Sequence, residues 1–95
     1  MYYRIASFAI DPSHEKDFLE IAERLRVKLK NTDEPPFIDY LKIEEQKAMI
    51  IISYENQNLA HEGDVYTRDV WSELQESQFV TGPLIISEGA VSWML

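Results

Sequence analysis

Two histidines are the side chains of this sequence best suited to acid–base or metal chemistry. His61, close to Glu62 and Asp64, is a candidate general base or metal ligand, because imidazole suits proton transfer near neutral pH. A surface helix residue is the alternative. His14 stands at a predicted helix start, where a surface position is the simpler interpretation. Two separate histidines do not make a His-rich metal site, so we expect no bound metal.

Four aromatic residues predict a pocket for a small molecule. Tyr40, Tyr54, Trp71 and Trp93 could line a space between helices and sheet. Such a space suits a flat phenolic or quinone ligand, with tyrosine hydroxyls binding its oxygens; ordinary core packing is the alternative. Arg4 lies in an apolar strand pattern, where it must form an ion pair or reach an edge, so we expect either a structural ion pair or dimer contact, or an anion-binding role. No P-loop, GxGxxG, HExxH or GxSxG motif accompanies these residues.

The composition of the chain limits the classes of molecule that it could bind. The net charge is −8, and it is uneven: residues 1–47 carry ten acids and eight bases, and residues 48–95 carry seven acids and one base. The second half therefore lacks the basic face that nucleic acid or an anionic membrane requires. The chain has no cysteine, which excludes disulfides and thiolate chemistry. No targeting segment is visible, so we expect a cytoplasmic protein.

Hydrophobic periodicity predicts one α+β domain over residues 1–95, with the ferredoxin-like order βαββαβ and both helices on one face of an antiparallel sheet. Runs that are apolar on both faces identify strands 2–10 and 48–54 as central. The predicted elements are strand 2–10, helix 14–30, strand 37–43, strand 48–54, a helical turn 59–62 ended by Gly63, helix 64–78 and strand 84–94. The expected inward helix residues are Phe18, Ile21, Ala22, Leu25 and Leu29, then Tyr66, Val70, Trp71 and Leu74.

The sheet face away from the helices is also predicted to be apolar. Both faces of the two central strands are mainly hydrophobic, and the last strand adds Leu84, Ile86, Val91, Trp93 and Met94. An apolar outer face is normally covered by a second sheet. We therefore expect a homodimer in which two copies of the chain pack sheet against sheet.

The chain resembles the antibiotic biosynthesis monooxygenase family of dimeric α/β-barrel proteins over nearly its whole length. The resemblance rests on the strand 2–10, the turn 11–18, the hairpin start 36–40, and the segment 50–56 leading into 59–61. Tyr54 stands where the family commonly has a tryptophan at the end of the third strand. The resemblance implies a ligand site between the sheet and the helices.

Two functions follow from this resemblance and remain open. The first is a monooxygenase without a prosthetic group that acts on an aromatic or quinoid molecule, with His61 as the base, Tyr54 and Tyr40 orienting the substrate, and Trp71 and Trp93 lining the pocket. The second is a non-catalytic dimeric module that binds a small ligand or only assembles. No cofactor is expected in either case.

Overall fold

The computed structural model describes residues 1–33 and 35–95, with every side chain of these except that of Tyr66. The loop residue Glu34 and the inward position expected for Tyr66 therefore lie outside the described residues. The elements are β1 (Tyr2–Ala9), the short 3-10 helix η1 (Pro12–His14), α1 (Glu15–Leu29), β2 (Phe37–Glu44), β3 (Lys47–Tyr54), α2 (Gln57–Glu76) and β4 (Ile85–Ala90).

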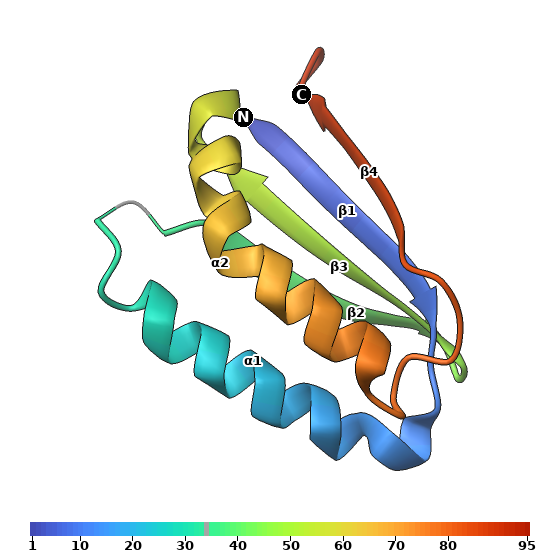
Figure 1. Cartoon of the computed structure of the whole chain (residues 1–95). Helices are drawn as coiled ribbons and strands as arrows, with labels where there is room; N and C mark the ends of the chain where they lie inside the picture. The colour runs from blue at the N-terminus through green and yellow to red at the C-terminus, as the bar shows by residue number, and fades with distance from the viewer. Residues whose placement is uncertain (34) are drawn as a thin grey trace.

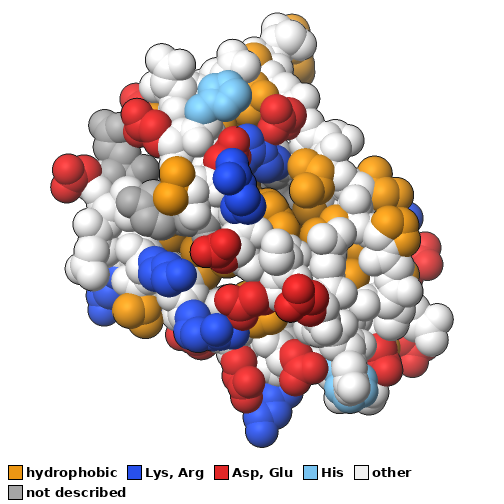
Figure 2. Space-filling view, viewed as in Figure 1, with side chains coloured by type: hydrophobic (Ala, Val, Ile, Leu, Met, Phe, Trp, Pro, Cys, Tyr) orange, Lys and Arg blue, Asp and Glu red, His pale blue; other side chains and the backbone are white. Residues whose placement is uncertain are grey.

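The four strands form one antiparallel sheet in the order β2-β3-β1-β4. The two strands predicted to be central are central, and the ferredoxin-like α+β architecture is confirmed. Both helices lie side by side on one face of the sheet, and the two chain ends meet at one end of it (Figure 1). Figure 2 shows that this helix-covered face carries most of its charged side chains over the helices.

The core contains the side chains on the inner face of the sheet. Successive residues of β1 alternate between buried and half-buried, so Tyr2, Arg4, Ala6 and Phe8 face the helices. Phe18 and Ile21 of α1 and Ala60 and Leu74 of α2 pack against this inner face, together with Phe79 and Val80 after α2. The side-chain oxygen of Asn56 accepts a hydrogen bond from the Leu59 amide at 2.9 Å, which starts α2 as a normal N-cap.

Two predicted boundaries are wrong. Residues 57–76 form one continuous helix, with no break at Gly63. No described glycine has a positive φ, so Gly63 does not end a helix. The last strand also stops at Ala90 and does not reach residue 94. Because β4 runs antiparallel to β1 and Ala90 is opposite Tyr2, the chain beyond residue 91 has no strand to pair with.

The outer sheet face is uncovered in a single chain. Large apolar side chains point away from the helices on the two edge strands: Phe37, Leu41 and Ile85, all more than 40% exposed. Ile43, at the irregular end of β2, is exposed as well. Tyr3, Ile5, Met49 and Ile51 lie between them and are half-buried by these neighbours. Within the described chain, neither helix combines the length and the hydrophobicity needed to cross a bilayer.

Candidate functional site

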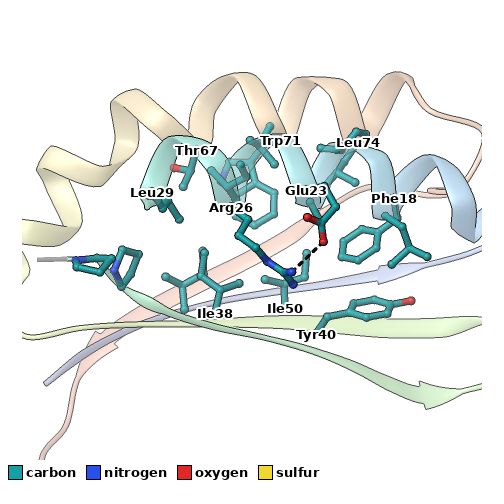
Figure 3. A pocket seen from close by; sticks show the side chains of 18 of the residues that line it. Phe18, Glu23, Arg26, Leu29, Ile38, Tyr40, Ile50, Thr67, Trp71 and Leu74 are labelled. Carbon is teal, nitrogen blue, oxygen red and sulfur yellow. Dashed lines mark ion pairs between the residues drawn. The ribbon is translucent and has the colours of Figure 1, made fainter. Parts of the chain in front are cut away.

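A cavity of about 790 Å³ lies between α1, α2 and the β2–β3 hairpin. Its walls come from the apolar stripe of α1, the inward residues of the hairpin and one side of α2 (Figure 3). The lining residues are Phe18, Leu19, Ile21, Ala22, Glu23, Leu25, Arg26, Leu29, Lys30, Pro35, Pro36, Ile38, Tyr40, Ile50, Ile52, Thr67, Val70, Trp71 and Leu74. This mixture of mostly apolar side chains with a few polar ones is typical of small-molecule sites.

The sequence pattern explains the cavity walls. Ile38 and Tyr40 are two residues apart on β2 and therefore share one face of that strand. Ile52 and Ile50 lie opposite them on β3, so all four side chains point toward the helices. Trp71 lies one turn from Thr67 on α2, so both line the same wall. The register of two strands and the period of the helices thus place these walls around one space.

Tyr40 contacts Phe18 and Glu15 of α1 at one part of the wall. Its ring stacks on Phe18 with a centroid distance of 4.3 Å. Its hydroxyl donates a hydrogen bond to Oε2 of Glu15 at 3.3 Å. That Glu15 oxygen also lies 2.7 Å from the Lys42 ammonium. Burial, with a further contribution from the Glu15 charge, raises the pKa of Tyr40 to about 12. Tyr40 is therefore protonated at neutral pH and cannot act as a base there.

A second, more polar cavity of about 740 Å³ adjoins the first and shares Leu29, Pro36 and Thr67 with it. Its other lining residues are Lys28, Asn31, Thr32, Asp33, Tyr54, Leu59, Glu62, Gly63 and Val65. Tyr54 belongs to this second cavity and not to the first. The two tyrosines expected to share one pocket are therefore separated.

Tyr54 is sealed beneath α2. The residue is 3% exposed, and its hydroxyl has no hydrogen-bond partner among the described residues. A Cβ placed on Gly63 would lie 2.9 Å from a carbon of the Tyr54 ring, so any other residue at position 63 would collide with it. Burial raises the pKa of Tyr54, while the positive charge of Arg4 acts in the opposite direction. The hydroxyl thus stays protonated and is enclosed by the packing of α2.

Arg4 is buried beside Tyr54 and forms ion pairs with two partly exposed carboxylates. Its guanidinium lies 5.8 Å from the centre of the Tyr54 ring. It is hydrogen-bonded to Asp64 of α2, and to Glu88 of β4 at 2.8 Å. The hydrogen bond from Arg4 lowers the pKa of Glu88 below its ordinary value. Two carboxylates already balance this guanidinium, so Arg4 joins β1, α2 and β4 as an ion-pair partner, one of the two roles expected for it.

The structure brings together only part of the predicted site. Tyr40 and Trp71 both line the first cavity, and Tyr54 lines the second. His61 is exposed on α2, and Trp93 is exposed in the C-terminal segment; neither lines a described cavity. No group of three potential metal ligands occurs among the residues that the structure describes. The catalytic and binding roles of these residues stay predictions.

Four polar lining residues were not identified from the sequence as site residues: Glu23, Arg26, Lys30 and Thr67. Arg26 and Glu23 form an ion pair of 3.0 Å at the open side of the cavity (Figure 3). A signal for them existed in the sequence, because they flank the apolar stripe of α1 at helical spacing. Nothing in the sequence distinguishes them from ordinary surface charges without knowing where the hairpin lies.

No family model matches the chain, and no curated protein matches it. Solved structures do. Rv0793 from Mycobacterium tuberculosis is 13% identical, with a TM-score of 0.72 over 98% of this chain and 96% of that one. A candidate antibiotic biosynthesis monooxygenase from Nitrosomonas europaea is 10% identical, with a TM-score of 0.73 over 98% and 100%. A third, from Caulobacter crescentus, is 20% identical, with a TM-score of 0.67 over 96% and 90%.

These likenesses extend over almost the whole of each chain, and several of the matched structures bear the same family name. At such low identities they establish the fold and carry no activity with them. The resemblance found in the sequence is confirmed at that level: the chain has the fold of the antibiotic biosynthesis monooxygenase proteins.

Proposed function

We propose that this chain is a member of the antibiotic biosynthesis monooxygenase family that binds a flat, apolar small molecule between its helices and its sheet. The observation that carries the proposal is the cavity of about 790 Å³ lined by Phe18, Tyr40 and Trp71. Its volume is within the range of small-molecule sites, and aromatic walls favour a ring system that can stack on them.

Binding has more support than catalysis. A cofactor-independent oxygenation, in which O₂ converts a ring CH₂ of the substrate to a carbonyl and water, needs a base to remove a substrate proton. Tyr40 holds its proton at neutral pH, and the exposed His61 lines neither cavity. Monooxygenation with His61 and Tyr54 in catalytic roles is the second candidate, supported by the names of the matched structures.

The two tryptophans provide a direct test of binding. Trp71 lines the cavity, whereas Trp93 is 76% exposed at the chain end. A Trp93→Phe variant therefore reports only on the cavity, and a Trp71→Phe variant only on the exposed end. We expect a soluble 1,4-naphthoquinone to quench the fluorescence of Trp93→Phe saturably, and to quench that of Trp71→Phe only in linear proportion to its concentration.

A steric pair of variants provides the control, made in the Trp93→Phe background. Ala22→Phe introduces a ring into the cavity from α1, and Val27→Phe introduces the same ring on an exposed position of that helix. We expect Ala22→Phe to abolish the saturable quenching and Val27→Phe to keep it. Equal binding by both variants, with both folded by circular dichroism, would remove the cavity as the site.

We also propose that the chain forms a homodimer through the outer face of its sheet. Phe37, Leu41, Ile43 and Ile85 supply the exposed apolar surface that supports it. Light scattering after size exclusion should give about 22 kDa, twice the 11.1 kDa of one chain. Leu41→Glu should elute with the mass of a single chain. Val27→Glu, at an exposed position of α1, should keep the mass of the dimer. A parent chain that elutes at 11.1 kDa would overturn the dimer.

A further inference from the structure

The opening of the first cavity is basic, although the chain as a whole is acidic. Among its described lining residues only Glu23, Arg26 and Lys30 carry a full charge at neutral pH, which gives this rim a balance of +1. The chain carries −8. Glu23 and Arg26 lie on α1 and Lys30 directly follows it, and Figure 2 shows basic side chains over the C-terminal half of that helix. The rim therefore differs in sign from the molecule that surrounds it.

The geometry aims one of these cations at the cavity. Arg26 and Lys30 are four residues apart, so they project from the same side of α1. Figure 3 shows the Arg26 side chain reaching from α1 across the opening toward Ile38 and Ile50 of the hairpin. A guanidinium in this position can donate two parallel hydrogen bonds to a carboxylate that emerges from the cavity.

The existing partner of Arg26 does not block that role. The Glu23 carboxylate lies 3.0 Å from the guanidinium, but the side chains of Arg26 and Glu23 are 76% and 62% exposed. An ion pair so open to water contributes little, and a ligand carboxylate can replace it.

We propose that the ligand of this cavity is an amphipathic monoanion, with a flat apolar body between the helices and the sheet and a carboxylate at the rim bound by Arg26 and Lys30. The inference rests on the proposed function and adds the charge of the ligand to it.

Two effects oppose an anion at the rim, and both are weak. The net charge of −8 acts from many scattered carboxylates, and at physiological salt screening limits such interactions to roughly 8 Å. The carbonyl end of the α1 dipole also lies near Lys30, because α1 ends at Leu29. A direct charge-assisted hydrogen bond is stronger than either effect.

Three naphthalene probes share one apolar ring system and differ in charge, so they separate the effect of the ring on binding from the effect of the charge. They are 2-naphthoate, 2-naphthol and 2-(aminomethyl)naphthalene, which are anionic, neutral and cationic at neutral pH. Calorimetric titration of the full chain should rank naphthoate tightest and the amine weakest. Arg26→Gln should weaken naphthoate about tenfold and leave naphthol unchanged. Glu23→Gln should tighten naphthoate. Lys16→Gln is the matched control, since it removes one positive charge from an exposed position of α1 outside the cavity.

The outcomes distinguish this inference from the proposed function. If naphthol binds and naphthoate binds no tighter, or if Arg26→Gln acts like Lys16→Gln, the monoanion is wrong while the apolar site stands. A preference for the amine has the same meaning. If none of the three probes binds, the proposed function fails and this inference fails with it. Loss of naphthoate binding in Arg26→Gln alone, with naphthol retained, supports the assignment.

Discussion

The space between the helices and the sheet is built in two contrasting ways. On the α1 side, Ala22, Ile38 and Trp71 surround an open cavity in which apolar side chains leave volume unfilled. Beneath the N-terminal half of α2, Arg4, Tyr54 and Gly63 are packed so closely that one added methyl group would collide. The difference shows that close packing is local to the contact between Tyr54 and Gly63, which also line the second, more polar cavity, whereas the α1 side keeps an apolar space that can bind a ligand.

The largest effect should come from breaking the cluster at the packed end. Arg4→Met removes the charge-assisted hydrogen bonds to Asp64 and Glu88, whose side chains are partly exposed, and should lower the free energy of unfolding by about 2 to 3 kcal/mol. Urea denaturation measures it. Arg24→Met is the control, since it removes an exposed ion pair with Glu73 and should cost less than about 1 kcal/mol. Equal losses would mean that Arg4 is not structural.

Larger side chains at position 63 and at position 22 should have different effects on stability. Gly63→Ala would normally stabilise a helix interior by about 1 kcal/mol, but here the methyl meets Tyr54 at 2.9 Å and overpacking should cost about 2 kcal/mol. Ala22→Leu adds three carbons on the cavity side and should change stability by less than about 0.5 kcal/mol. Thermal unfolding of both variants tests this. Stabilisation by Gly63→Ala would refute the close packing.

Acidification should weaken the packed end. The pKa of Glu88 is lowered in the folded chain, chiefly by the hydrogen bond from Arg4, so its contribution is complete above its ordinary value of 4.5 and is lost as the pH falls through the folded value. Because the side chain is partly exposed, we expect a loss of about 1 kcal/mol or less. Glu88→Gln should flatten the decline in urea midpoint between about pH 6 and about pH 3, whereas Glu20→Gln should leave it unchanged.

The smallest effect should come from the hydroxyl of Tyr54. It has no hydrogen-bond partner among the described residues, so Tyr54→Phe should change stability by less than about 0.5 kcal/mol. Tyr40→Phe loses a hydrogen bond to Glu15 and should cost about 1 kcal/mol. Chemical denaturation compares the two. A larger loss for Tyr54→Phe would show that its hydroxyl is bonded in solution, which would strengthen the case for a role in a site.

Local patterns in the sequence predicted most of the fold. Runs that are apolar on both faces identified β1 and β3 as central strands, and a 3.6-residue apolar stripe identified α1. The prediction of a break at Gly63 failed for an identifiable reason. From the local chain alone, a glycine within a helical pattern predicts the end of a helix. Here Gly63 instead makes room for the side chain of Tyr54, which lies nine residues earlier in the chain and on the sheet.

The sequence alone determined which residues share one face of a strand or helix, because strand and helix periods are properties of neighbouring residues. Only the tertiary structure decided which inward residues enclose space. It put Tyr40 and Trp71 on a cavity, enclosed Tyr54 under α2, left Trp93 exposed and brought Arg26 to the rim. The reason is that a cavity depends on how far each helix stands from the sheet. That distance results from side-chain volumes on elements far apart in the chain, and no local pattern records it.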